Sequence, residues 1–426
     1  MERNDPRYQA YVEILKEELI PAMGCTEPIA LAYAAAKARE VLGVLPDSVQ
    51  LQVSGSIIKN VKSVIVPNTG HLKGMEAAVA AGIIAGSAEK ELEVISEVSE
   101  EKKSAIRDYL QTVPITIEHT EQGHVFDIVV TERCGQDYAR VRIADYHTNI
   151  CCIEKNGTVL YEVPLLDETV QEDARADRSL LNMQDIWDFA ETADLRDVAD
   201  LLERQIRYNN AIAEEGLLGD YGANIGRVLL TTYGNDVSNR AKAKAAAGSD
   251  ARMNGCELPV IINSGSGNQG ITCSVPLIEY AKELHSGKEK LYRALIISNL
   301  VAIHEKTGIG TLSAYCGAVS AGAGAGAGIV YLCGDGYQAA IHTVVNALAI
   351  VSGIVCDGAK ASCAAKIASS VDAALLGYNM YKCNQEFKGG DGIVMKDIET
   401  TIKGIGRLGK DGMRQTNEEI IRLMIE

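Results

Sequence analysis

The segments 125-VFDIVVTE-132 and 138-YARVRIADYH-147 decide the fold class, because their apolar residues recur mainly at every second position. This period of two is typical of β-strands that bury one face. The neighbouring runs 113-VPITIEH-119 and 150-ICCIEKNGTVLY-161 follow the same pattern, and an Asn-Gly pair in the last run signals a hairpin turn. We therefore expect an antiparallel sheet in this part of the chain.

Helical patterns surround the predicted sheet. Ahead of it, three segments have apolar residues at helical spacing, and two short runs resemble further strands. The predicted helices cover 6–20, 29–43 and 74–86, and the predicted strands cover 49–55 and 61–67. After the sheet, the acidic and weakly patterned stretch 164–179 predicts a linker, beyond which nearly every segment has helical spacing.

The fold class that follows from these patterns is α+β. We expect an N-terminal α+β domain with an antiparallel sheet at residues 1–170, which carries Cys25, and an all-α C-terminal domain at residues 171–426. A chain of 426 residues is long enough for two domains of ordinary size.

The composition argues against several classes of protein. A net charge of −16 repels a phosphate backbone, so we expect no nucleic-acid partner. The most membrane-like stretch, 312–332, is mostly Gly and Ala, and the polar N-terminus lacks the pattern of a signal peptide. We therefore expect a cytoplasmic protein that does not cross a membrane. Its eleven cysteines then indicate free thiols rather than a disulfide framework.

Glycine and alanine dominate the tract 317-GAVSAGAGAGAG-328. Glycine inside a helix costs about 1 kcal/mol relative to alanine, so its repeated use needs a structural reason. Two interpretations are open, since small residues allow either close contact between helices or the approach of backbone to a ligand. Close helix contact would also suit a homodimer.

Cys356 and Cys363 stand out in 354-IVCDGAKASCAAK-366 because small residues surround them. In one continuous helix they would lie ~10.5 Å apart, too far for one small metal centre. Gly358 favours a break, so we expect a loop after Cys356 and a helix that begins near Ala361. That loop could fold both sulfurs toward zinc or an iron–sulfur cluster, although a spacing of seven matches neither zinc fingers nor ferredoxins. The alternative is a pair of packed thiols.

Cys316 and Cys25 are further candidates for chemistry. Cys316 precedes the Gly/Ala tract, and Cys25, in 20-IPAMGCTEPIAL-31, precedes a predicted helix. A thiol at a helix N-terminus has a lowered pKa and can act as a nucleophile or a base. For both residues, burial as an ordinary core thiol is the alternative interpretation.

Several of these segments together resemble the L-cysteine desulfidase family, which is related to the iron–sulfur L-serine dehydratases. They are the IPAMGCTEP motif, the GSGNQG turn at 265–270, the stretch around Cys316, and 356-CDGAKASC-363. The region 401–419 is also similar to the C-terminal stretch of the dehydratases. The resemblance covers essentially the whole chain. The short interval between the last two cysteines favours the desulfidase branch, because the corresponding interval in the dehydratases is longer.

This resemblance implies a [4Fe–4S] cluster held by only three cysteines, which by motif are Cys316, Cys356 and Cys363. One iron then keeps an open position for a substrate. The resemblance also implies a lyase of amino-acid catabolism that works without pyridoxal phosphate and degrades L-cysteine to pyruvate, ammonia and sulfide. The all-α domain would be the catalytic, cluster-binding part, and Cys25 would be the proton acceptor.

Such a reaction also needs a group that binds the substrate carboxylate. The segment 263-NSGSGNQG-270 offers backbone N–H groups and short polar side chains, although it could equally be an ordinary tight turn before a helix. The candidates for substrate binding are Asn263, Ser264, Ser266 and Asn268. His71, in a Gly-rich loop, could line the same cleft. We interpret His147 and the histidines inside helical patterns as structural.

Two further functions stay open at this level. One is L-serine dehydration by the same mechanism, and the other is a metal-binding or cluster-binding redox protein without turnover. A thiol base at Cys25 favours L-cysteine as the substrate. Apart from a small amino acid and a second copy of the chain, we expect no partner.

Overall fold

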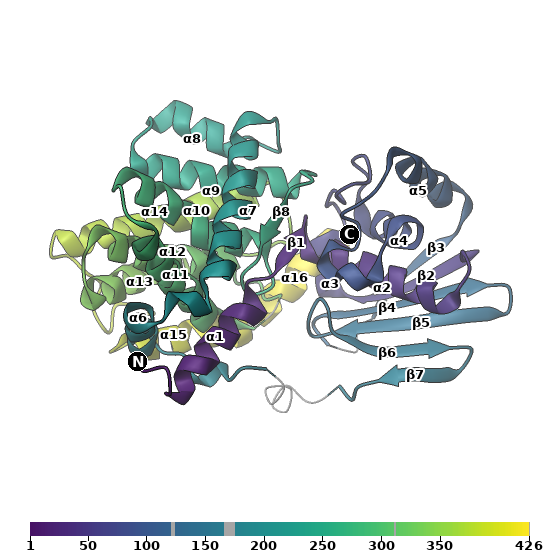
Figure 1. Ribbon diagram of the computed structural model, residues 1–426, viewed down its shortest axis with the longest axis horizontal. Coiled ribbons are helices and arrows are strands. Elements are labelled where there is room, and N and C mark those ends of the chain that lie inside the picture. The colour runs from purple at the N-terminus through teal and green to yellow at the C-terminus, as the bar shows by residue number, and fades with distance from the viewer. Residues whose placement is uncertain (121–123, 166–174, 311, 426) are drawn as a thin grey trace.

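The computed structural model describes residues 1–120, 124–165, 175–310 and 312–425. They form two lobes that lie side by side, one built around a sheet and one built from helices (Figure 1). The middle of the predicted linker, residues 166–174, lies outside the described residues.

The α/β lobe is built on a six-stranded sheet in the order β3-β2-β4-β5-β6-β7. Its strands are β2 (Ser48–Ser54), β3 (Ile115–Thr120), β4 (Asp127–Cys134), β5 (Asp137–Ala144), β6 (Ile150–Lys155) and β7 (Thr158–Glu162). Its helices are α2 (Thr26–Leu42), α3 (Gly55–Val61), α4 (Gly74–Ala85) and α5 (Glu100–Thr112), with the short 3-10 helix η1 (Ala88–Glu93). Helices α2, α4 and α5 gather on one side of the sheet (Figure 1).

The pairing of the strands confirms the α+β class and refines it. All neighbouring strands are antiparallel except β2 and β3, which run parallel. The exception arises because helices α3, α4 and α5 connect β2 to β3, and a parallel pair needs a crossover connection of this kind. The sheet is therefore mixed rather than purely antiparallel.

One predicted strand, at 61–67, is wrong. Helix α3 occupies its first residue, and Ile65 makes only an isolated bridge, to Lys73. Val64 and Val66 are buried in the loop that follows α3. They alternate with Ser63 and Ile65, which are exposed and partly exposed, so this loop imitates the period of two that indicates a strand.

The helical lobe contains α1 (Pro6–Glu18) and most of the chain after residue 175. Its helices are α6 (Met183–Thr192), α7 (Ala199–Leu218), α8 (Ile225–Tyr233), α9 (Val237–Met253), α10 (Gly267–Glu283), α11 (Lys288–Ile309), α12 (Gly317–Cys333), α13 (Tyr337–Val351), α14 (Cys363–Lys382), α15 (Ile398–Arg407) and α16 (Arg414–Ile425). Short turns η3 (Arg178–Leu180), η4 (Leu195–Asp197) and η5 (Leu408–Gly412) connect them. As predicted, this part of the chain is almost entirely helical.

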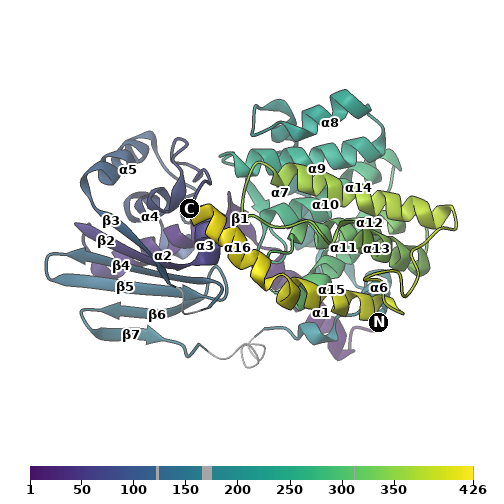
Figure 2. The same ribbon diagram turned by 180° about the vertical axis from the view of Figure 1, so that it is seen from behind.

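Helix α12 is the Gly/Ala tract, and it lies at the centre of the lobe against α10, α11, α13 and α14 (Figures 1 and 2). A Cβ at Gly322 would come within 2.8 Å of Ser370 on α14, and one at Gly328 within 2.8 Å of the carbonyl oxygen of Ala294 on α11. The predicted close contact between helices is thus confirmed. It lies within one chain, so the tract does not itself argue for a homodimer, which stays a prediction.

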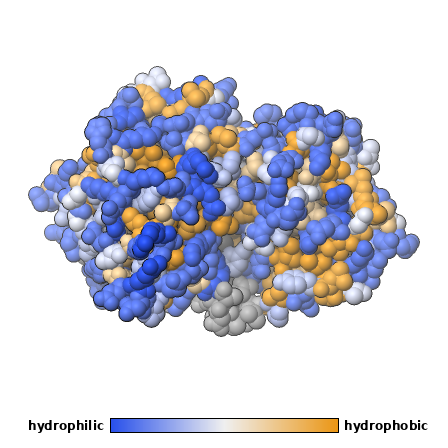
Figure 3. Space-filling model, in the orientation of Figure 1, coloured by the Kyte–Doolittle hydropathy of each residue, from blue (hydrophilic) through white to orange (hydrophobic). Residues whose placement is uncertain are grey.

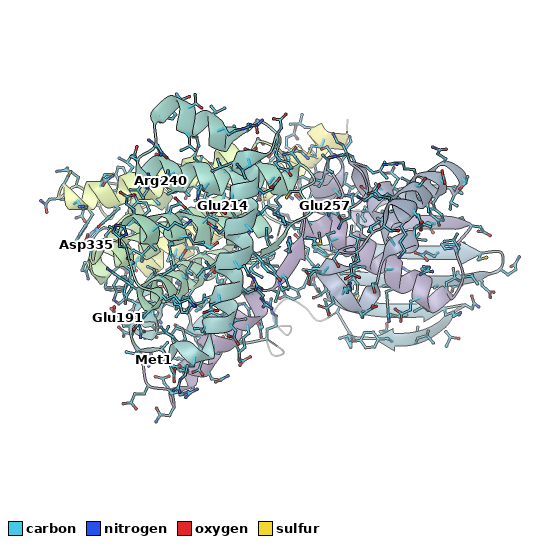
Figure 4. The ribbon with its side chains drawn as sticks, turned by 45° about the horizontal axis from the view of Figure 1, so that its top comes forward. Met1, Glu191, Glu214, Arg240, Glu257 and Asp335 are labelled. Carbon is cyan, nitrogen blue, oxygen red and sulfur yellow. The ribbon has the colours of Figure 1, made fainter. Side chains whose placement is uncertain are left out.

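Both ends of the chain tie the lobes together. On the helical lobe, the Tyr11 hydroxyl of α1 donates a hydrogen bond to the Leu180 carbonyl oxygen at 2.8 Å. Strand β1 (Pro21–Met23) then pairs antiparallel with β8 (Pro259–Ile261). At the other end, α16 runs back to the α/β lobe and contacts α3 (Figure 2). Glu257, labelled between the lobes in Figure 4, accepts a hydrogen bond from Lys103 of α5 at 3.4 Å.

The surface in Figure 3 is mostly polar with several apolar areas, one of which lies over the sheet of the α/β lobe. Strand β7 forms the sheet edge there, and its residues Val159, Leu160 and Tyr161 are each roughly half exposed. Within the part of the chain that is described, no helix is both long enough and apolar enough to span a membrane.

Candidate functional site

Cys316 and Cys356 lie on two segments that meet in an isolated antiparallel bridge between Tyr315 and Val355. The Cys316 N–H donates to the Ile354 carbonyl oxygen at 3.2 Å, and the Cys356 N–H donates to the Ala314 carbonyl oxygen at 2.6 Å. In this pairing the two cysteines are diagonal neighbours, so their side chains point to the same face. Two thiols that are far apart in the sequence are therefore placed side by side.

Cys363 is the first residue of helix α14, and a loop joins it to Cys356, as predicted. Gly358 allows this loop, since its φ is +90° and a Cβ there would overlap the carbonyl oxygen of Lys59. The Cys363 thiol lies 3.6 Å from the Gly358 carbonyl oxygen. The loop thus packs closely on α3 of the other lobe, with Cys363 near enough to Cys356 for their charges to interact.

Cys25 reaches the same place from the α/β lobe, where it is the N-cap of helix α2. Its side chain is 1% exposed, and its sulfur lies 3.7 Å from the sulfur of Met253. The two residues form a small buried cluster with Val64, against which Ala359 and Cys363 pack. Cys25 therefore faces the cysteine loop across the junction of the lobes.

Burial governs the acidity of these thiols. It raises the pKa of Cys25 and of Cys316 to about 12, and it also raises the pKa of Cys363. The neighbouring thiols of Cys356 and Cys363 push the pKa of Cys316 in the same direction, as expected for sulfurs that are close together. The expected lowering of the Cys25 pKa by its helix is wrong, because complete burial outweighs the helix N-terminus.

Helix N-termini converge on the group of cysteines. Helices α2, α12 and α14 begin at Cys25, Cys316 and Cys363, and α10 begins nearby at Gly267. The amide of Gln269 on α10 lies against the first residue of α12, which brings these two helix starts together. The positive end of a helix favours anions, so this arrangement suits thiolates and an anionic ligand.

Lys59 and Lys306 add positive charge to the site of an otherwise acidic protein. Lys59 is fully buried, and its Nζ lies 3.4 Å from the Cys356 carbonyl oxygen and 2.6 Å from Asn417 Oδ1 on α16. Burial lowers the pKa of Lys59, and it lowers the pKa of Lys306 on α11 to about 8. The thiols of Cys316 and Cys356 oppose both shifts, which places both amines close to them.

Two further lysines, Lys360 and Lys366, flank Cys363 in the sequence. The Nζ of Lys360 lies 3.0 Å from the Ser63 hydroxyl, and Lys366 forms an ion pair with Asp357. Together with the helix starts, the four lysines give the thiols a positive environment that would stabilise their deprotonated, metal-binding form.

The donor set fits an iron–sulfur cluster. Cys316, Cys356 and Cys363 supply three thiols in a positive environment, and thiolates are the ligands that such clusters use. Across the described residues, no three His, Cys, Asp or Glu side chains are arranged to hold a single metal ion.

The predicted substrate segment forms a tight turn and the first residues of α10. Asn263 is fully buried and donates to Asn299 Oδ1 at 3.0 Å, while the Ser264 hydroxyl donates to Asn263 Oδ1 at 2.9 Å. Asn263 therefore holds the turn on the core. Ser264, Ser266 and Asn268 are candidates whose contact with a substrate stays a prediction.

Sequence reasoning missed three buried polar side chains around this turn. They are Arg252, Gln269 and His147, each with a polar atom that has no hydrogen-bond partner among the described residues. The guanidinium of Arg252 lies against Gly267, and the ring of His147 lies against Gly265. His147, which we interpreted as structural, is thus part of the wall between the lobes. Burial lowers the pKa of His147, whereas the nearby charge of Glu27 raises it.

His71 stands apart from this group. Its side chain is exposed, its φ is +67°, and its ring lies near Gly255 in the loop after α9. In the described part of the chain, no contact joins it to any of the four cysteines.

Only some of the missed residues left a signal in the sequence. Lys360 and Lys366 flank Cys363 directly, and Glu27 follows Cys25 within the GCTEP motif. Arg252 and Lys306 carry no motif and reach the site only because helices α9 and α11 pack there.

Known proteins that resemble the chain agree on one family. Residues 89–422 match the family model described as serine dehydratase alpha chain. A UPF0597 protein of Desulfitobacterium hafniense is 61% identical over 425 residues, covering 100% of this chain and 98% of that protein. Another, from Lachnoclostridium phytofermentans, is 52% identical over 98% of this chain and 100% of its own length. A third, from Treponema denticola, is 46% identical over 100% of both chains. The matched region includes all three clustered cysteines, and the chain belongs to the serine dehydratase alpha chain family.

Proposed function

We propose that the protein is a lyase that eliminates sulfide from L-cysteine and releases pyruvate and ammonia. The observation that carries this proposal is the meeting of four thiols from separate parts of the chain. Cys316, Cys356 and Cys363 point into one positive environment, and Cys25 faces them from the other lobe. An elimination of this kind needs a Lewis-acidic metal group and a base. The three clustered thiols can hold the metal group, and Cys25 can act as the base.

A [4Fe–4S] cluster held by Cys316, Cys356 and Cys363 would supply, when bound, a Lewis-acidic iron for the leaving sulfur. The chain's own residues do the rest. The thiolate of Cys25 takes the proton from the α-carbon, and the polar turn at 263–270 binds the carboxylate. The electron pair of the broken C–H bond forms the Cα–Cβ double bond as the Cβ–S bond breaks. The resulting 2-aminoacrylate tautomerises to an imine, which one water molecule hydrolyses to pyruvate and ammonium.

The burial of Cys25 bears on its role as the base. A thiol with a pKa of about 12 is seldom ionised at neutral pH, yet its thiolate is a strong base once it forms. The positive charges of Arg252 and Lys360 lower the pKa of Cys25 against the effect of burial. They therefore favour the thiolate at the moment of proton transfer.

The second candidate is dehydration of L-serine by the same mechanism, which the family description favours. The two reactions differ only in the leaving group, hydroxide instead of sulfide. A thiol substrate has the advantage that sulfide is the better leaving group and the softer ligand for iron.

Anaerobic reconstitution with iron and sulfide, followed by assays on both amino acids, tests the proposal. We expect equal amounts of sulfide and pyruvate from L-cysteine, at a kcat/KM at least about tenfold above that for L-serine. Faster pyruvate release from L-serine would assign the second candidate. Iron-loaded protein that releases pyruvate from neither substrate would overturn both and leave a redox or structural role.

A further inference from the structure

Arg252 is a buried cation that forms no ion pair with any described acidic residue. Its side chain is 3% exposed, its Nη1 donates to the neutral amide oxygen of Asn268 at 3.2 Å, and its Nε has no acceptor among the described residues. Removing a charge from water is costly unless an opposite charge compensates it. The guanidinium therefore has the features of a group whose counter-ion comes from a ligand.

The surroundings of Arg252 indicate the chemical class of that ligand. The guanidinium lies against Gly267, the first residue of α10, where any Cβ would overlap Nε. A helix N-terminus carries about half a positive charge, so two positive groups are in contact here. An anion beside both would relieve their repulsion, and a carboxylate fits the planar donors of a guanidinium.

Glu27 supplies the opposite charge on the other side of the same turn. The Thr26 hydroxyl lies 3.2 Å from Glu27 Oε2 and 3.0 Å from the Gly265 carbonyl oxygen. The Glu27 carboxylate is partly exposed, and no described Lys, Arg or His forms an ion pair with it. Both charged residues therefore meet the turn at 265–267, Arg252 directly and Glu27 through Thr26.

Cys25 lies beside both charged residues. It precedes Glu27 by two residues at the start of α2, and its sulfur lies 3.7 Å from the sulfur of Met253, the residue that follows Arg252 on α9. A molecule held by an anionic end at Arg252 and a cationic end at Glu27 would present the atom that carries both ends to the Cys25 sulfur.

We infer that Arg252 binds the α-carboxylate and Glu27 binds the α-ammonium group of a free amino acid, next to Cys25. The inference rests on the proposed function for the reaction at the α-carbon, and it names the substrate class: small L-α-amino acids with both ends unmodified. Peptides, N-acyl amino acids and esters lack one of the two charges, so the site should reject them.

Binding of ligands without a leaving group tests the inference separately from the reaction. Anaerobic, cluster-loaded protein is titrated with L-alanine, propionate and ethylamine, and dissociation constants are measured by ligand-observed NMR. Arg252→Met should weaken L-alanine and propionate by about 10–100-fold and leave ethylamine unchanged, because one charge-assisted contact is lost. Glu27→Gln should weaken L-alanine and ethylamine and leave propionate unchanged. Arg227→Met, on the exposed arginine that pairs with Asp220, is the matched control and should change nothing.

The pattern across ligands separates recognition from mere structural damage. Equal weakening of all three ligands by either variant, or unchanged L-alanine binding in Glu27→Gln, would overturn the inference. The wild-type protein provides a test that needs no variant, since N-acetyl-L-alanine and L-alanine methyl ester should each bind at least about tenfold more weakly than L-alanine. Similar binding of all three would also refute it. Alanine cannot undergo the elimination, so these results hold whether or not the protein releases sulfide.

Discussion

Helices α2 and α12 begin alike and lie among different neighbours. Each has a buried cysteine as its N-cap, Cys25 or Cys316, and burial raises the pKa of either thiol to about 12. Cys316 faces the thiols of Cys356 and Cys363. Cys25 instead packs on the thioether of Met253, and the charge of Arg252 lowers its pKa against the effect of burial. The ligand and base roles that we propose for the two thiols therefore differ in the neighbours that the tertiary structure brings to each, and not in the local sequence at the helix start.

Removing each thiol in turn should have the largest effect and tests directly whether the two thiols have different roles. Cys316→Ser should abolish iron binding after anaerobic reconstitution, since one of three ligands is lost. Cys25→Ala should keep the iron and lose about 10²–10⁴-fold in turnover, the usual effect of a missing general base. Iron content per chain and sulfide release measure the two effects. The comparison fails if both variants lose iron to the same extent.

The pH dependence of turnover sharpens the role of Cys25. The thiol must lose its proton before it can accept one from the substrate, and burial raises its pKa to about 12. Its thiolate fraction therefore grows about tenfold per pH unit below that pKa, and kcat should rise between pH 7 and 9. The residual kcat of Cys25→Ala should be flat over the same range. A flat profile for the wild-type enzyme would exclude Cys25 as the base.

A pair of glycines tests whether the cysteine loop depends on the other lobe. Gly358 and Gly334 have φ values of +90° and +88°, but a Cβ at Gly358 would overlap the Lys59 carbonyl oxygen, whereas Gly334 faces open space. Gly334→Ala should cost about 1–2 kcal/mol in unfolding free energy, from the backbone conformation alone. Gly358→Ala should cost about 1–3 kcal/mol more and should also reduce iron binding. Chemical denaturation and iron analysis compare the two, and equal values for both variants would speak against the packing of the loop on α3.

Glu132 shows what a buried ionisable group does when no site surrounds it. It is fully buried in β4, neither carboxylate oxygen has a hydrogen-bond partner among the described residues, and burial raises its pKa well above 4.5. The unfolded chain therefore releases this proton more easily, so its contribution to stability falls as the pH rises above about 4.5. Glu132→Leu should stabilise the protein at pH 8 by about 1–3 kcal/mol. The gain should shrink at pH 5, as thermal or denaturant unfolding can show.

The fold could be predicted where one face of an element is buried. The strands of the sheet and helix α1 have clear periods, and their predicted positions agree with the structure. The prediction failed at 61–67, where a loop buries alternate residues and so imitates the period of a strand. The parallel pairing of β2 and β3 was also missed, because strand direction depends on the helices between them.

The candidate site was predictable where motifs mark it and not elsewhere. Sequence motifs mark Cys25, Cys316, Cys356 and Cys363, and Gly358 correctly indicates the loop between the last two. The raised pKa of Cys25 could not be foreseen, because it depends on residues that bury the thiol from three other segments.

The amino-acid sequence by itself determined the α+β class, the division of strands and helices along the chain, and the thiols that can carry chemistry. Periodicity and residue type are local properties, so they are legible in the chain alone. Only the tertiary structure decided which thiols lie together and which charges surround them, above all the approach of Arg252 and Glu27 to Cys25. Electrostatic interactions and burial depend on distances in space, and segments far apart along the chain set those distances.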